Sequence, residues 1–205
     1  MMNRIWPTRM YEFLSFIQKI DIDRKILDCG AGGPNPPLAL FAERGYDCFG
    51  IDISNKAVES AMSFAENYGL ELDLKVGDMR NIPFVDDYFN FVYTQNTICH
   101  LSKADQKIAI DEMVRVLQPN GILYIDFMST ESSYCGSPEL GTDIGTHEYH
   151  FVDEDSEDVL HVFFDDDEPD AFFENAKIVR KLKIVRKLSI PRESEDVWYY
   201  YYVTK

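Results

Sequence analysis

The sequence predicts an α/β fold in which a mostly parallel, doubly wound sheet carries helices on both faces. Short apolar runs alternate with helical patterns along the first 130 residues, and this alternation is typical of β-α-β units. A glycine-rich turn follows the first apolar run, as in sheets that bind a ligand at their carboxyl edge. The length of 205 residues, with 45% hydrophobic residues, suits one domain with a full core.

Five strands are expected in this first part of the chain. Residues 7–20 come before them and are predicted to be helical, because Phe13, Ile17 and Ile20 recur at helical spacing. The predicted strands are short apolar segments bounded by turn residues: 25–29, 47–53, 72–76, 89–94 and 122–127. The predicted helices between them are 38–43, 56–68 and 102–117.

The expected helix ends follow from capping residues. Asn35, which precedes Pro36, and Ser54 are predicted N-caps, and Ser102 with Asp105 resembles a capping box. Gly69 is expected to stop the third helix. Residues 119–121, Pro-Asn-Gly, are expected to form a turn.

The pattern changes after Met128. Residues 129–164 are polar and acidic, with two or three short β candidates such as 159–164. A short helix is expected from Asp165 to about Asn175. The stretches 177–188 and 197–204 suit an antiparallel hairpin. Residues 177–188 repeat the hexapeptide KIVRKL in tandem, which suits an edge strand protected by lysines. A basic amphipathic helix for a membrane or partner is the alternative.

The charge is strongly negative and unevenly spread. The formal net charge is −16, which argues against nucleic acid or an anionic membrane as the main partner. Residues 116–176 hold sixteen acidic residues and no Lys or Arg. This run is interpreted either as a solvated surface or as a field that favours cationic, amine-bearing substrates. Residues 153–158 alternate like a calcium loop but lack its central glycine.

Four cysteines are widely spaced, with no CxxC pair and no Cys/His cluster. They are interpreted as reduced thiols of a cytoplasmic protein, and no metal site is expected. The first ten residues have no apolar core of a signal peptide. No apolar run approaches the roughly 20 residues that a membrane-spanning helix needs.

The main chemical motif is the run Asp28-Cys-Gly30-Ala-Gly32-Gly-Pro34 between the first strand and the next helix. Glycines there allow a tight turn and close approach of a ligand to the backbone. Asp52 ends the second strand, where a carboxylate can accept both hydroxyls of a ribose. Asp78 follows the third strand, where it can accept from an exocyclic amine. The three segments are expected to converge at one edge of the sheet.

The runs ILDCGAGG, GYDCFGIDIS, GDMRNIPF, FNFVYTQNTICHL and MVRVLQPNGILYIDF together resemble the class I S-adenosylmethionine-dependent methyltransferases, specifically the small type 11 domain. The resemblance covers residues 22–130, and the last two β-stretches match the family's closing hairpin. It implies a Rossmann-like sheet of seven strands with the last antiparallel. It also implies a single domain over 1–205 in which 129–164 form a substrate-side insertion.

The resemblance assigns cofactor roles to the glycine loop and the second strand. Gly30 and Gly32 would line the methionine part of S-adenosylmethionine. Asp52 would bind the ribose, with Ile53 beside the adenine. Asp28 would be the motif's acidic residue, which orients the glycine turn or an ordered water.

The same resemblance places Asp78 and Met79 at the adenine edge, and it lets Gln95 offer its carbonyl to the methionine amine. Pro34 is a departure, because the family often has a third glycine there and proline lacks an N–H.

Two other functions are weighed. A nicotinamide-dependent oxidoreductase would need a glycine where this chain has Asn35, and Pro36 and Pro37 remove donors that a pyrophosphate needs. A non-catalytic module that binds S-adenosylmethionine or a partner is the main alternative to an enzyme with a small-molecule substrate. The sequence does not distinguish them, because in-line methyl transfer needs no obligatory base.

His100, just after the fourth strand, is the candidate catalytic base. The insertion supplies further substrate-side candidates, which are Tyr134, His147, Tyr149 and His150. Cys99 is interpreted as a buried thiol, because no Pro-Cys pair accompanies it. Oligomeric state, substrate identity and the methylated atom are not determined by the sequence.

Overall fold

The computed structural model describes residues 5–137, 142–143, 146–152, 158–188 and 194–205. Its helices are α1 (Thr8–Ile17), α2 (Leu38–Ala42), α3 (Asn55–Tyr68) and α4 (Lys103–Val116), with short 3₁₀ segments η1 (Ile98–His100) and η3 (Glu168–Phe173). Its first five strands are β1 (Lys25–Cys29), β2 (Asp47–Asp52), β3 (Leu72–Val76), β4 (Phe89–Tyr93) and β5 (Leu117–Ser129). The later strands are β6 (Thr142–Asp143), β7 (Glu148–Val152), β8 (Asp158–Phe164), β9 (Lys177–Leu188) and β10 (Ser194–Thr204).

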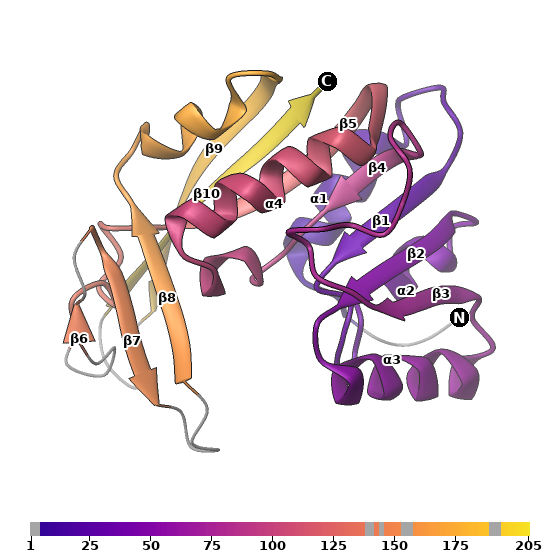
Figure 1. Ribbon diagram of the computed structural model, residues 1–205, viewed down its shortest axis with the longest axis horizontal. Coiled ribbons are helices and arrows are strands. Elements are labelled where there is room, and N and C mark those ends of the chain that lie inside the picture. The colour runs from indigo at the N-terminus through magenta and orange to yellow at the C-terminus, as the bar shows by residue number, and fades with distance from the viewer. Residues whose placement is uncertain (1–4, 138–141, 144–145, 153–157, 189–193) are drawn as a thin grey trace.

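The main sheet has the order β3-β2-β1-β4-β5-β10-β9 (Figure 1). Strands β1 to β5 are parallel, and β10 runs antiparallel to both β5 and β9. One apolar core packs α1, α2 and Phe64 of α3 against one face, and a second packs α4, η1 and η3 against the other. The predicted seven-stranded sheet with an antiparallel last strand is confirmed.

Two of the three predicted N-caps are confirmed, and one is wrong. The hydroxyl oxygens of Ser54 and Ser102 accept from the N–H groups of Ala57 and Asp105. Helix α2 begins at Leu38, but Pro37 and not Asn35 stands at its cap position, and no side chain caps it. An N-cap at Asn35 would have to accept from Pro37 or Leu38, and Pro37 has no N–H to donate.

Strand β5 begins earlier than predicted. Leu117 pairs with Phe89, and the next pairing joins Ile122 to Phe91, so the register shifts across this segment. The predicted turn 119–121 therefore forms an irregular segment within the strand, with Pro119 and Asn120 exposed. Asn120 has φ of 66°. Asn tolerates this left-handed conformation better than most residues.

In the described residues, the insertion after β5 forms a small sheet and not a loop. Strands β6, β7 and β8 pair antiparallel, and β8 joins the carboxyl end of β5 through the pairs Met128–Phe163 and Ser129–Phe164. A small apolar cluster of Cys99, Met128, Tyr149 and Phe163 fastens it to η1. Figure 1 shows this small sheet beside the main one. It therefore extends the sheet at the carboxyl end of β5.

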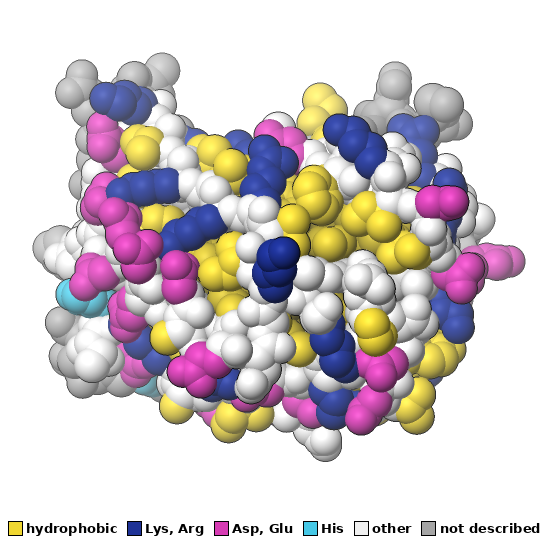
Figure 2. Space-filling view, turned by 90° about the horizontal axis from the view of Figure 1, so that it is seen from above, with side chains coloured by type: hydrophobic (Ala, Val, Ile, Leu, Met, Phe, Trp, Pro, Cys, Tyr) yellow, Lys and Arg dark blue, Asp and Glu magenta, His cyan; other side chains and the backbone are white. Residues whose placement is uncertain are grey.

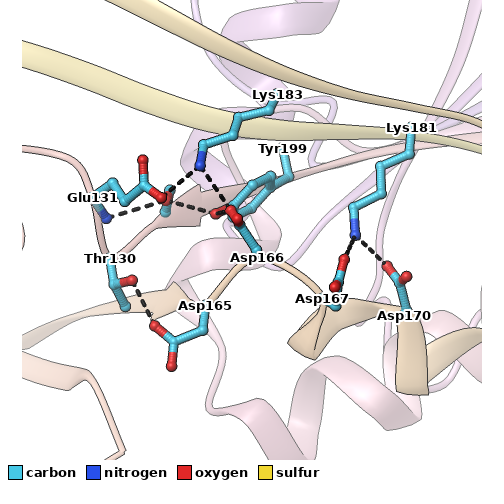
Figure 3. A network of polar contacts seen from close by, with 10 residues as sticks. Thr130, Glu131, Asp165, Asp166, Asp167, Asp170, Lys181, Lys183 and Tyr199 are labelled. Atoms are coloured by element: carbon cyan, nitrogen blue, oxygen red, sulfur yellow. Dashed lines mark hydrogen bonds and ion pairs between the residues drawn. The ribbon is translucent and has the colours of Figure 1, made fainter.

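The acidic residues after β8 pair with lysines of β9 (Figure 3). The Lys181 ammonium lies 2.8 Å from both Asp167 and Asp170. The Lys183 ammonium lies 2.6 Å from Glu131 and 2.8 Å from Asp166. Figure 2 shows basic and acidic side chains next to one another on the face seen from above. Part of the acidic run thus balances the basic hexapeptide repeat.

In the described residues β9 pairs with β10 alone, which confirms the predicted edge strand. The same part of the chain contains no helix that is long and apolar enough to cross a bilayer. It also contains no group of three His, Cys, Asp or Glu side chains that could hold a metal ion. Residues 153–157, most of the calcium-like segment, lie outside the described residues.

Candidate functional site

A cavity of about 270 Å³ lies at the carboxyl ends of β1, β2 and β3, next to η1. Its lining brings together six residues that the sequence predicted: Gly30, Asp52, Ile53, Asp78, Met79 and His100. The remaining lining residues are Ile51, Gly77, Thr97 and Leu101. Ile53 is 69% exposed although it is apolar. A cavity with an apolar rim and convergent carboxylates is what a nucleoside-like ligand requires.

The glycine turn is packed so tightly that side chains are excluded. Gly30 has φ of +113°, and an added Cβ would lie 2.4 Å from Thr97 Oγ1. An added Cβ on Gly32 would lie 2.4 Å from Asp52 Oδ2. The N–H groups of Gly30 and Ala31 both donate to the carbonyl of Ile51, at 2.8 and 3.0 Å. The loop therefore lies directly against the end of β2.

Asp52 is oriented by two backbone donors. The Gly32 N–H donates to Oδ2 and the Ser54 N–H donates to Oδ1, each at 2.9 Å. A carboxylate has about four lone-pair directions, so this side chain keeps acceptor capacity after both bonds are made. Since Asp52 also lines the cavity, it fits a ligand with neighbouring hydroxyl groups.

Asp78 already has a cationic partner, which the sequence motifs did not reveal. Arg80 donates from its backbone N–H at 2.8 Å and from Nη2 at 2.7 Å to this carboxylate. These contacts lower the pKa of Asp78, with the side-chain hydrogen bond as the largest cause. Arg80 also reaches Asp105 of α4 at 3.2 Å. Arg80 therefore connects the loop after β3 to α4. Its position two residues after Asp78 is the feature of the sequence that could have indicated this contact.

Asp28 lies beneath the glycine turn and does not line the cavity. It is 2% exposed, and the Tyr93 hydroxyl donates to its Oδ2 at 2.6 Å. Burial raises the pKa of Asp28 to about 7. The predicted direct contact with the turn or a water stays a prediction. The geometry gives this residue a buried supporting position.

Gln95 lies on the other side of the loop that follows β4. Gln95 and Asn96 line a second cavity of about 600 Å³, whereas Thr97 lines the first. Asn96 has φ of 53°, and its N–H donates to Asp126 at 3.0 Å. Burial raises the pKa of Asp126 to about 7. A buried carboxylate thus holds this loop between the two cavities.

His100 faces the insertion as well as the first cavity. Its Nδ1 lies 2.9 Å from the carbonyl oxygen of Leu160. A carbonyl only accepts, so Nδ1 carries the hydrogen and the neutral ring keeps its lone pair on Nε2. The ring of His161, another residue absent from the predicted site, lies 5.0 Å away. Burial, followed by the electrostatic interaction with the nearby His100, lowers the pKa of His161 to about 4.

The four predicted substrate-side residues line neither cavity. Tyr149 is 7% exposed and packs edge-on against Phe163 in the core of the insertion. Tyr134 lies against the ring of His161 at 5.7 Å. His147 accepts at its backbone carbonyl from the Phe163 N–H, and His150 lies on β7 opposite Leu160. Their contact with a substrate stays a prediction.

Comparison with known proteins agrees with this geometry. Residues 27–125 match the family model described as a methyltransferase domain, and the matched segment contains β2 to β4, most of β1 and every element of the first cavity. This segment of 99 residues, just under half of the chain, is therefore similar to a methyltransferase domain.

Individual relatives match part of the chain. An uncharacterized methyltransferase, YcgJ of Bacillus subtilis, is 33% identical over 111 residues, which are 53% of this chain and 43% of that protein. Norajmaline N-methyltransferase of Rauvolfia serpentina is 33% identical over 104 residues, which are 50% of this chain and 35% of that protein. The matched segment thus spans less than half the length of these relatives.

Solved structures extend the likeness to the whole fold. A methyltransferase from Methanosarcina mazei superposes with a TM-score of 0.74 at 21% identity and covers 98% of both chains. A second, from Clostridium acetobutylicum, has a TM-score of 0.73 at 13% identity and covers 98% of this chain and 92% of its own. At these identities the likeness establishes the fold, including the closing hairpin.

Proposed function

We propose that this chain is an enzyme that transfers a methyl group from S-adenosylmethionine to a small-molecule acceptor. The observation that carries the proposal is the first cavity. It brings the Gly30 turn, Asp52 and Asp78 to one place from three successive strand ends. That arrangement suits a ligand with a nucleoside at one end.

The residues of the cavity fit this cofactor. The space that a Cβ would fill at Gly30 and Gly32 is already taken by Thr97 and Asp52, so only glycine lets the backbone turn at this depth. Asp52 would accept from the ribose hydroxyls with its remaining lone pairs, and Ile53 and Met79 would cover the adenine. Asp78 would accept from the adenine amine beside its bond to Arg80. Gln95, which lines the second cavity, would reach the methionine amine across the loop after β4.

The bound cofactor supplies an electrophilic methyl group. The chain's own residues align the acceptor and exclude water. His100 Nε2 would take the proton when the acceptor must lose one, because Nδ1 is held by the Leu160 carbonyl.

The nature of the acceptor is supported by the relatives' names and by charge. The names of two relatives refer to norajmaline and sterols as substrates, which supports a small molecule here. A net charge of −16 disfavours nucleic acid. The buried thiols Cys29, Cys48 and Cys99 without disulfides support a cytoplasmic protein.

Calorimetry and a turnover assay test this proposal. S-adenosylhomocysteine is expected to bind with a Kd in the micromolar range, corresponding to roughly 7–8 kcal/mol. A labelled methyl donor is expected to transfer its methyl group to one class among amines, phenols, thiols and carboxylates. Tighter binding of NAD than of S-adenosylhomocysteine would contradict the assignment. Binding without transfer to any class would favour the non-catalytic module instead.

A further inference from the structure

The second cavity is built by residues that are distant in the sequence. It lies between the start of α1, the loop 95–96 and the β9–β10 hairpin, and its volume is about 600 Å³. Its polar and aromatic lining includes Trp6, Arg9, Arg186, Asp196, Trp198 and Tyr200. No predicted site residue except Gln95 contributes to it.

The cavity wall is locally cationic in an acidic protein. It carries two arginines and one carboxylate, Asp196, while the whole chain has a net charge of −16. Arg9 forms an ion pair with Glu12 on α1. Arg186 is held only loosely, because its Nη1 lies 3.7 Å from Asp196 and its Nη2 lies 3.3 Å from the Tyr200 hydroxyl.

Asp196 does not fully neutralise Arg186. Its Oδ1 accepts from the Trp198 indole N–H at 2.6 Å, which is a stronger contact than the one to Arg186. A guanidinium has five N–H donors in a planar fork, and the contacts of Arg186 with Asp196 and Tyr200 use at most two. Arg186 therefore keeps donors that match a second planar anion, a carboxylate.

Aromatic rings form the rest of the wall. Trp6 is 5% exposed and Tyr200 is 3% exposed, and the Arg9 guanidinium lies 5.0 Å above the Tyr200 ring. Flat side chains of this kind bind flat ligand surfaces by stacking. The half-buried Trp198 is therefore the cavity ring most open to a flat ligand, and it lies in the same wall as the Arg186 guanidinium.

We propose that the second cavity is the acceptor site and takes a planar aromatic compound whose carboxylate binds Arg186. The proposal rests on the proposed function and gives it a substrate class. The adjacency supports it, since Gln95 and Asn96 line this cavity and the next residue, Thr97, lines the first. The carboxylate is the recognition handle, and Arg186 acts in binding and positioning.

Intrinsic fluorescence gives a direct test. The chain has two tryptophans, Trp6 and Trp198, and both line this cavity. Cinnamate, added to the full chain saturated with S-adenosylhomocysteine, is expected to quench tryptophan emission with a saturable Kd. Cinnamamide has the same shape without the charge and is expected to bind about tenfold or more weakly.

The tandem repeat supplies a matched control. Arg186 and Arg180 occupy the same position of the two KIVRKL units, but Arg180 lies over the Tyr202 ring, outside the cavity. Arg186→Gln is expected to weaken cinnamate binding about tenfold and to remove the preference over the amide. Arg180→Gln is expected to leave both unchanged. Both sites are exposed, and circular dichroism verifies that each variant folds.

Three results would overturn the proposal. One is the absence of quenching by cinnamate, and another is equal binding of cinnamate and cinnamamide. The third is an Arg186→Gln variant that loses affinity for S-adenosylhomocysteine instead, because the cavity would then serve the cofactor's own carboxylate. Failure of the wild-type chain to bind S-adenosylhomocysteine would count against the proposed function itself, and that measurement is separate from the cinnamate titration.

Discussion

The two cavities lie on opposite sides of one loop, residues 95–97, and the chain builds them in different ways. The first uses residues at the carboxyl ends of β1, β2 and β3 or within a few positions after them, together with Thr97, His100 and Leu101 after β4. The second joins residues from 5–9 with residues from 186–200, which are almost the whole chain apart in sequence. The first cavity is therefore visible as sequence motifs, whereas the second exists only after the sheet has closed with β10.

The largest expected effect is that of a substitution in the glycine turn, which should weaken binding at the first cavity far more than at the second. Gly32→Ala would place a Cβ 2.4 Å from Asp52 Oδ2 and 2.5 Å from the Ala57 Cβ. The loop must move away from β2, and affinity for S-adenosylhomocysteine is expected to fall about 100-fold or more. Cinnamate quenching at the second cavity is expected to change far less. Isothermal calorimetry and fluorescence measure the two affinities.

Gly33→Ala is the control in the same loop. Gly33 has φ of +97°, but an added Cβ meets nothing within 4 Å. Strain alone is expected to lower the free energy of unfolding by about 1–2 kcal/mol, with cofactor affinity close to that of the wild type. Equal losses of affinity in both variants would mean that strain, and not the contact with Asp52, controls the site.

The next effect concerns the buried carboxylates beneath the cavities. Asp126 has a pKa of about 7 in the folded chain and about 3.9 when unfolded. The folded state therefore holds more protons between about pH 4 and 7, and its stability falls as pH rises through this window. Asp126→Asn is expected to remove on the order of 2 kcal/mol of this pH dependence.

Urea unfolding at several pH values measures that difference. Asp28 is the matched residue beneath the first cavity, with the same raised pKa, and Asp28→Asn is expected to act in the same direction. Asp47→Asn, at the exposed start of β2, is the surface control and should leave the profile unchanged. If the wild-type chain and Asp126→Asn showed the same change in the free energy of unfolding between pH 5 and 7, the argument would be contradicted.

A smaller effect is expected at Asp52. Asp52→Asn keeps the shape and one oxygen but loses the charge and one acceptor, so affinity for S-adenosylhomocysteine is expected to fall about tenfold. The Gly32 N–H bond at 2.9 Å must be kept by the remaining oxygen. Calorimetry measures the affinity of Asp52→Asn for S-adenosylhomocysteine, with Asp47→Asn at the other end of the same strand as the control. An unchanged affinity would remove Asp52 from the proposed ribose site.

The contrast between the cavities also explains what could be predicted from the sequence. Strands β1 to β4 and the loops after them were predicted, because apolar periodicity and glycine placement act within a few residues. The Asn35 cap was wrong because it ignored the missing N–H of Pro37. His161 and Arg186 were missed as site residues because their roles depend on partners 61 and 14 positions away. Those contacts are set by strand pairing, which local patterns do not encode.

The smallest effect concerns the lysines of β9. Lys181 and Lys183 connect β9 to four acidic side chains, but most of these groups are largely solvent-exposed, where ion pairs contribute little. The double variant Lys181→Met and Lys183→Met is expected to lower the melting temperature by a few degrees or less at low salt. At high salt the difference should vanish, since the wild-type pairs are then screened. Lys177→Met, at the start of the same strand, controls for the loss of a positive charge.

The double substitution in β9 should affect ligand binding at the second cavity more than at the first. Strand β9 carries Arg186, whereas no residue of β9 lines the first cavity. The double variant is therefore expected to weaken cinnamate binding slightly and to leave affinity for S-adenosylhomocysteine unchanged. If both affinities fall together, the acidic run stabilises the whole sheet and not the hairpin alone. If a cationic probe such as benzylamine bound better than cinnamate in the wild type, the remaining acidic charge would control the acceptor, and the local arginine would not.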